Sequence, residues 1–180
     1  MKKMAVLTLV MAMIIVSALP ACALKKDDIS PLVWADYVDW ANSLIDGGRF
    51  IQFSQCGLKV WMCNTFQPVK LSRQDINEGV IGYYLHNGSE PYGMQVTYQL
   101  LNVKNRDKYE KTILASGGSD LLYATINGIP AIIYNDKKHN ALCVAIVDQF
   151  GGVAVFSFFP ASSIGFYEEA QNMICSIQKN

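Results

Sequence analysis

The chain has 180 residues, 15 basic and 15 acidic side chains, a net charge of zero and 51% hydrophobic residues. This charge balance excludes the basic surface that nucleic-acid binding requires. The hydrophobic content excludes a natively disordered chain, and the length suits one domain with a single core.

The N-terminal segment has the pattern of a secretory signal peptide. Two lysines precede the uncharged apolar run 4–19, which is too short for a comfortable membrane span. Ala21 and Ala23 then provide small residues at the −3 and −1 positions of a cut before Leu24. We therefore expect an exported protein, with a signal sequence of bacterial type and no transmembrane segment in its mature chain.

The same residues permit a second interpretation. Leu19-Pro20-Ala21-Cys22 resembles a bacterial lipobox, in which Cys22 would be acylated and would anchor the protein to a membrane. The sequence leaves open whether the protein is secreted or a lipoprotein. Residues 1–23 contain two basic and no acidic side chains. Without them, the domain 24–180 carries a net charge of −2.

Four cysteines remain in that domain. Cys143 and Cys175 lie in apolar surroundings, where a free cysteine behaves as a small hydrophobic residue, so we interpret them as buried thiols. Cys56 and Cys63 flank one predicted strand, and a disulfide between them depends on the register of its hairpin. The sequence leaves open whether these two cysteines form a disulfide or remain free thiols.

The first predicted element of the domain is a helix over residues 30–45. Ser30 and Pro31 suit its cap and first turn, and an apolar stripe begins at Trp34 and Val38. Asp36 and Asp39 could share a face of this helix, but without a cleft they are interpreted as solvated carboxylates.

Strand patterns follow in two blocks. The first block predicts strands over 50–53, 58–62, 80–86 and 93–101, with an irregular crossing at 64–71 and one helical turn at 72–79. A helix over 104–116, capped by Asn105, ends this block.

The last third predicts an antiparallel meander and a closing helix. Four apolar runs between residues 120 and 160 are separated by Asn127-Gly128, by a polar cluster and by Gly151-Gly152, which suit tight hairpins. Ser162 or Ser163 then caps a helix whose apolar stripe reaches Ile177. The order of elements indicates an α+β fold with a central antiparallel β-sheet of about six to eight strands and helices packed against it.

The chain resembles the Mog1/PsbP-like superfamily over most of residues 50–179. The most telling segments are INGIPAIIY, ALCVAIV and VAVFSFFP, followed by a helix that closes on CSIQ. More narrowly, it is similar to small exported bacterial proteins that carry this domain. The resemblance implies this fold and an accessory binding role without catalysis, and it transfers no functional residue.

The candidate chemistry is sparse. His86 and His139 lie beside polar turns, and no spacing of histidine, cysteine and carboxylate matches a metal site, so no metal or cofactor is predicted. A cysteine-dependent hydrolase or redox protein is the alternative function, and it requires Cys56 or Cys63 to be reactive and close to a histidine.

Aromatic side chains are the other feature that bears on function. Tyr83-Tyr84 and Phe158-Phe159 each point to opposite faces of a strand. Most aromatic residues therefore fill the core, and a minority can line a groove for a protein, peptide or glycan. We predict a non-enzymatic accessory or binding domain whose partner the sequence does not identify.

Overall fold

The computed structural model describes residues 31–36, 38, 47–88 and 92–180. Its helical segments are the 3₁₀ turn η1 (Trp34–Asp36), α3 (Arg73–Asn77), α4 (Arg106–Ala115) and α5 (Ile164–Cys175). Its strands are β1 (Gly48–Phe53), β2 (Leu58–Cys63), β3 (Phe66–Pro68), β4 (Val80–His86), β5 (Gly93–Leu100), β6 (Gly118–Ile126), β7 (Ile129–Asp136), β8 (Ala141–Val147), β9 (Gly152–Phe159) and β10 (Gln178–Lys179).

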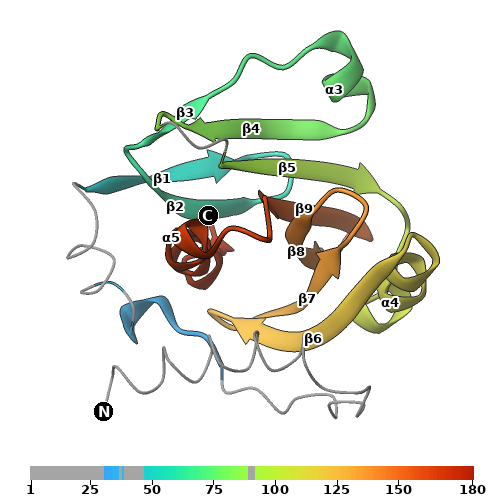
Figure 1. The fold of residues 1–180 in the computed structure, drawn as a ribbon. Coiled ribbons are helices and arrows are strands. Elements are labelled where there is room, and N and C mark those ends of the chain that lie inside the picture. Colours follow the sequence, from blue (N-terminus) through green and yellow to red (C-terminus); the bar gives the residue numbers. More distant parts are fainter. Residues whose placement is uncertain (1–30, 37, 39–46, 89–91) are drawn as a thin grey trace.

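Seven strands form one antiparallel sheet in the order β3-β4-β5-β9-β8-β7-β6. The predicted meander is its second half, and β5 joins the first half to it by pairing with β9. The sheet curves, and α5 lies in its hollow beside β1 and β2, whereas α4 covers its outer side (Figure 1). Strands β1, β2 and β10 make a separate small sheet. The predicted α+β class with a central sheet is thus confirmed.

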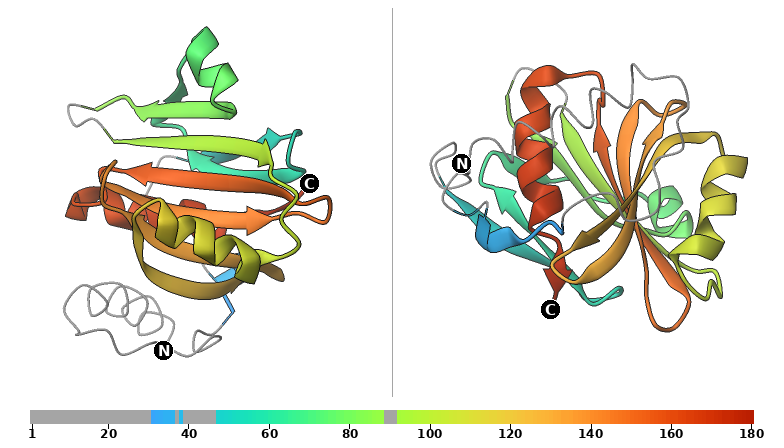
Figure 2. Two further views of the ribbon diagram at one scale, coloured as in Figure 1. Left: turned by 90° about the vertical axis from the view of Figure 1, so that its right-hand side faces the viewer. Right: turned by 90° about the horizontal axis from the view of Figure 1, so that it is seen from below.

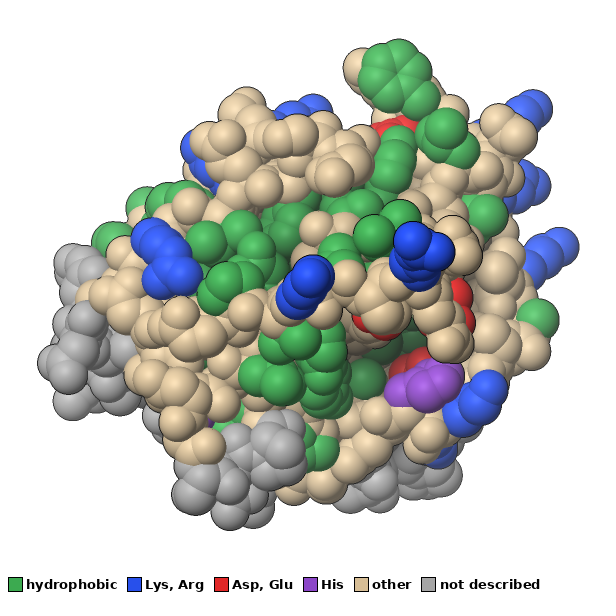
Figure 3. Space-filling view, turned by 90° about the horizontal axis from the view of Figure 1, so that it is seen from above, with side chains coloured by type: hydrophobic (Ala, Val, Ile, Leu, Met, Phe, Trp, Pro, Cys, Tyr) green, Lys and Arg blue, Asp and Glu red, His purple; other side chains and the backbone are tan. Residues whose placement is uncertain are grey.

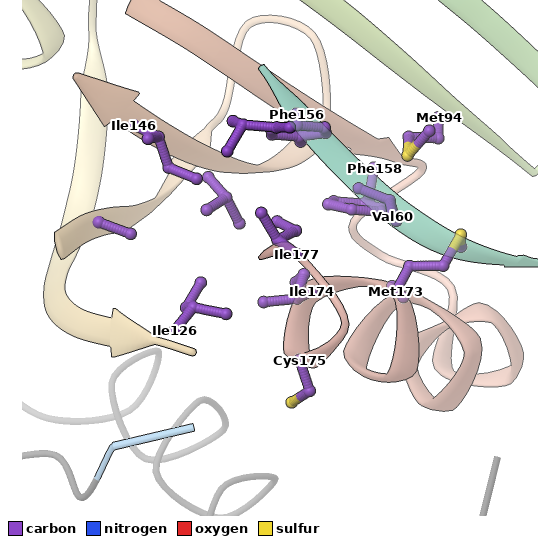
Figure 4. Close-up of a cluster of buried hydrophobic side chains, with 14 of the residues drawn as sticks. Val60, Met94, Ile126, Ile146, Phe156, Phe158, Met173, Ile174, Cys175 and Ile177 are labelled. Atoms are coloured by element: carbon purple, nitrogen blue, oxygen red, sulfur yellow. The ribbon is translucent and has the colours of Figure 1, made fainter. Parts of the chain in front are cut away.

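The two faces of the curved sheet carry separate apolar clusters. The larger cluster lies between the sheet, α5 and β2 (Figure 4). Figure 2 shows from two further sides how these elements are arranged. It contains Phe158 and is contacted by Tyr84, whereas Phe159 packs against the smaller outer cluster, which includes Ile113 of α4. The predicted alternation of the Phe158-Phe159 pair is therefore confirmed.

Three sequence predictions about single elements are wrong. Leu32 pairs with Ile126 as a parallel bridge, so the predicted helix does not run through Leu32, and the helical structure of the described residues starts at Trp34. The crossing at 64–71 contains β3, an edge strand, where Pro68 is tolerated because an edge strand can leave one side unpaired. The closing helix ends at Cys175, and Gln178–Lys179 pairs with β2. Residues 39–45 of the predicted first helix, including Asp39, lie outside the described residues.

Asn127 links three segments that are distant in sequence. Its side-chain oxygen accepts from the Trp34 N–H at 2.7 Å, and its amide nitrogen donates to the Cys175 and Ile177 carbonyls at 2.8 Å each. Its φ of 47° and that of Gly128, 79°, are the left-handed values that a tight hairpin turn requires. One turn residue therefore connects the N-terminal segment, the β6–β7 hairpin and the end of α5.

Candidate binding site

An open cavity of about 540 Å³ lies where several strands of the sheet end. The β1–β2 turn, the start of β7, the β8–β9 hairpin and the last residues of the chain surround it. Apolar side chains make much of its wall and polar groups stand around them. Its lining residues with apolar side chains are Cys56, Leu58, Tyr98, Ile129, Pro130, Ile146, Val147, Phe150 and Ala154.

A second hollow of about 450 Å³ lies next to this cavity and includes the start of α4. Both hollows are lined by Pro130, Val147, Asp148 and Gln149, so they share one wall. Asn105 begins α4 here, and its side chain accepts from the Lys108 N–H at 3.1 Å, as the sequence predicted.

Asp148 organises the β8–β9 hairpin. One of its carboxylate oxygens accepts from the Phe150 N–H at 2.7 Å and the Gly152 N–H at 2.9 Å, and the other accepts from the Tyr98 hydroxyl at 2.7 Å. Burial opposes ionisation, but the bonds from Tyr98 and from the Gly152 and Phe150 N–H groups outweigh it and hold the pKa of Asp148 below its usual range. The bond to Asp148 raises the pKa of Tyr98 to about 12.

These bonds fix the tip of the hairpin, on which Phe150 is 74% exposed. Leu100, which pairs with Gly152 at the same end of the sheet, is 68% exposed. Neither residue is required by the core, and both are large and apolar. A rigid turn thus presents an aromatic side chain at the rim of the cavity.

The cysteines are not arranged for catalysis or for a disulfide. Cys56 lies in the β1–β2 turn and Cys63 at the far end of β2, and both are free thiols. Five steps of about 3.3 Å separate Leu58 from Cys63 alone, well beyond the roughly 7 Å between Cα atoms that a disulfide tolerates. The Cys56–Cys63 bridge, which the sequence left open, is therefore not formed in this structure. Cys143 and Cys175 are buried thiols, as expected.

Burial raises the pKa of the Cys56 thiol, and it raises that of Cys63 to about 12. Neither histidine forms a hydrogen bond to a described cysteine. The His139 ring is 2.7 Å from the Asp136 carboxylate, and Nδ1 of His86 accepts from the Gly88 N–H at 3.0 Å. The geometry that a thiol nucleophile requires is therefore not present among these residues.

Among residues 31–36, 38, 47–88 and 92–180, no group of three or more metal-ligating side chains comes together. Over the same part of the chain, no helix is long and apolar enough to cross a membrane. The predicted signal-cleavage residues Ala21 and Ala23 and the lipidation candidate Cys22 lie outside it.

Sequence reasoning placed Cys56 near a turn but did not find the cavity or its main residues. Tyr98 lies 50 residues before Asp148, which shares the β8–β9 turn with Phe150, and only the pairing of β5 with β9 brings Tyr98 to that turn. The one signal available was the segment Asp148-Gln149-Phe150-Gly151-Gly152, in which a turn holds a large aromatic residue that a turn does not need.

A further apolar area lies on the side of α3, β3 and β4. In Figure 3, hydrophobic side chains gather in the hollowed centre of this face, and Lys and Arg side chains stand around them. Exposed hydrophobic residues on neighbouring elements include Phe50 of β1 and Ile76 of α3, which are 40% and 60% exposed. The apolar surface of the molecule therefore extends beyond the cavity.

The structure is similar to the solution structure of cyanobacterial PsbP (CyanoP) from Synechocystis sp. PCC 6803. The TM-score is 0.53 and the sequence identity 9%, over 76% of this chain and 94% of that chain. This chain has the Mog1/PsbP-like fold. At this identity the likeness shows the fold and not an activity.

A second similar structure is that of the Ran-binding protein Mog1p of Saccharomyces cerevisiae. It matches with a TM-score of 0.42 and 10% identity, over 74% of this chain and 95% of that chain. The sequence matches no family model and no curated protein. The function of this chain must therefore be argued from its own surface.

Proposed function

We propose that this protein is an exported, non-catalytic accessory domain that binds a segment of a partner protein in the cavity at the strand ends. The observation that carries the proposal is the exposed Phe150 on a hairpin tip that Asp148 holds in place. Aromatic residues in fixed positions are typical of the few interface residues that supply most of the binding energy.

The rigidity of the hairpin supports this role. Ordering a flexible side chain or loop on binding costs free energy, and a turn that is already held by three hydrogen bonds avoids much of that cost. The cavity is within the usual size range of ligand sites, roughly 300–1,000 Å³. Its apolar wall favours a hydrophobic side chain of a protein over a glycan, which is the alternative ligand.

The export part of the proposal rests on residues 1–23. The intact mass of the protein from its own cells tests it: a chain that begins at Leu24 and is found in the medium supports a secreted factor. An acylated chain that begins at Cys22 and is found in the membrane supports a lipoprotein. A full-length mass within the cell would contradict both.

The binding part can be tested by site-specific photo-crosslinking. A photoreactive phenylalanine analogue replaces Phe150 in one protein and Leu114 of α4 in a control, since Leu114 is also apolar and is 53% exposed. In cells of the source organism, we expect position 150 to crosslink to one discrete protein and position 114 not to do so. Equal products at both positions would contradict a specific site.

The crosslinked partner is then purified and its affinity is measured. Phe150→Ala should weaken binding about 30-fold, since an aromatic residue that supplies much of the binding energy contributes about 2 kcal/mol or more. Leu114→Ala should leave the affinity unchanged. Unchanged affinity of the Phe150→Ala variant would refute the proposal, and binding of glycans but not of protein would favour the alternative ligand.

A further inference from the structure

Strand β1 has an open edge. The small sheet has the order β1-β2-β10, and the register between β1 and β2 contains no shift. At one end of this ladder the Asn64 N–H donates to the Gly47 carbonyl at 3.2 Å. Because the bonds of an antiparallel ladder alternate, every second residue of β1 turns its N–H and C=O away from β2. These residues are Gly48, Phe50 and Gln52.

Strand β2 shows the same alternation. Trp61 pairs with Phe50, and the Trp61 N–H donates to Ser176 Oγ at 2.8 Å, on the side opposite β1. The backbone groups of Phe50 therefore point the other way, to the open side. No hydrogen bond joins the outward N–H and C=O groups of β1 to any residue that the structure describes. Phe50 is also 40% exposed, so solvent reaches this edge.

The other sheet edges in the described part of the chain are protected. Strand β3 has three residues and contains Pro68, β6 is bridged by Leu32 and has a register shift, and β10 has two residues. Short strands, proline, bulges and covering segments are the features that keep sheet edges from pairing with other chains. Strand β1 has six residues, no proline and no register shift. Its edge is therefore available for pairing.

The side chains of β1 and β2 define the chemistry of a partner. Neither strand contains an acidic residue, and their charged side chains are Arg49 and Lys59. Arg49 is exposed and donates to the neutral Asn64 at 3.2 Å, and Lys59 Nζ lies 5.4 Å from the centroid of the Phe50 ring. Ile51 lies on the same face as Arg49 and packs against the larger apolar cluster while partly exposed. An acidic and an apolar side chain complement Arg49 and Ile51 across a strand pair.

We propose that the free edge of β1 binds an extended, acidic segment of another protein, which adds a fourth strand to the small sheet antiparallel to β1. Its backbone exchanges hydrogen bonds with Gly48, Phe50 and Gln52, as in other complexes formed by strand addition. In its own chain direction the segment has an apolar residue opposite Ile51, an apolar residue opposite Phe50 and an acidic residue opposite Arg49. This interface is separate from the cavity, because none of these residues lines it.

Charge favours a foreign segment over a second copy of β1. A second copy would bring another Arg49 and no acidic residue to the edge. Strand β1 lies above β2 in Figure 1, so its free edge is on the side that Figure 3 shows from above. On that side Lys and Arg side chains surround an apolar hollow. A segment with apolar and acidic side chains complements both features.

An NMR titration of the protein with a synthetic peptide tests the interface. The peptide contains Thr-Val-Phe-Glu-Thr between flanking threonines, so that Val, Phe and Glu lie opposite Ile51, Phe50 and Arg49. We expect the Phe50 amide to exchange about tenfold more slowly at saturation and the Ile51 amide, which faces β2, to stay unchanged. Unchanged exchange of Phe50 at up to about 1 mM peptide would overturn the inference. Signal shifts around Phe150 in place of β1 would put the peptide in the cavity and would also overturn it.

Two N-methylated peptides provide a matched control. Methylation of the Phe nitrogen removes the N–H that faces the Phe50 carbonyl, so it should weaken binding about tenfold. Methylation of the Val nitrogen, which points away from β1, should change the affinity less than about twofold. Equal effects of the two methyl groups would show that the peptide does not pair as a strand and would overturn the proposal.

A charge exchange tests the register. Arg49→Glu should weaken binding of the peptide about fivefold, and a peptide with Lys in place of Glu should restore the affinity for this variant. Failure of the Lys peptide to restore binding would overturn the assigned register and with it the proposal. Protection of the Phe50 amide that rises with protein concentration alone would assign the edge to a second copy and would overturn the proposal as well.

Discussion

Replacing Asn127 with alanine should be the most destabilising single change in any turn of this protein that the structure describes. The side chain makes three hydrogen bonds, at 2.7, 2.8 and 2.8 Å, and each typically contributes about 1 kcal/mol. The φ of 47° adds about 1 kcal/mol, because alanine disfavours left-handed dihedral angles. We therefore expect a loss of about 4 kcal/mol in the free energy of unfolding.

Asn102 provides a matched control. Its φ is 55°, it is exposed, and no side-chain hydrogen bond is described for it. Asn102→Ala should therefore cost about 1 kcal/mol, so the difference between the two variants isolates the hydrogen bonds of Asn127. Asn127→Gly should lie between them, at about 3 kcal/mol, because glycine tolerates the dihedral angle but also lacks the side chain.

Urea unfolding followed by tryptophan fluorescence measures these differences. Trp34 and Trp61 lie 5.7 Å apart between ring centroids, beside the segments that Asn127 connects, so their emission reports on this region. A loss for Asn127→Ala that is within about 0.5 kcal/mol of the loss for Asn102→Ala would refute the reasoning. It would mean that water replaces these bonds without cost.

Three further outcomes can be measured on the same protein. Asp148 has a folded pKa below its unfolded value of about 3.9, so its stabilisation is complete above that pH and is lost as the pH falls through the lowered pKa. The stability of the Asp148→Asn variant in acid unfolding curves should lack this part of the pH dependence. A curve identical to that of the unchanged protein would contradict the role of Asp148. Native Cys56 should react slowly with thiol reagents at neutral pH and Cys63 only after unfolding, and rapid labelling of either would contradict their raised pKa values. Ile174→Ala should cost about 2–5 kcal/mol because Ile174 is fully buried, and a loss below about 1 kcal/mol would mean that the core collapses around it.

The local pattern of the chain determined most of its elements. Asn127-Gly128 and Gly151-Gly152 predicted hairpins because few residues other than asparagine and glycine adopt positive φ readily, and Gly128 and Gly151 have φ values of 79° and 80°. Asn105 predicted the start of α4 because its side chain can accept from a free N–H of the first turn. These signals lie within a few residues of what they specify, so sequence alone was sufficient.

Tertiary structure decided the remaining features because they depend on pairing between distant segments. Leu32 forms a bridge to β6 because the Thr125 carbonyl and the Asn127 N–H bond to its backbone, and Gln178–Lys179 pairs with β2 instead of continuing the helix. The cavity exists because β5 pairs with β9, which brings Tyr98 to Asp148 and fixes Phe150 at the rim. The sequence by itself determined most of the strands, turns and helices. The choice of neighbouring strands, which rests on summed burial and long-range hydrogen bonds, created the candidate site.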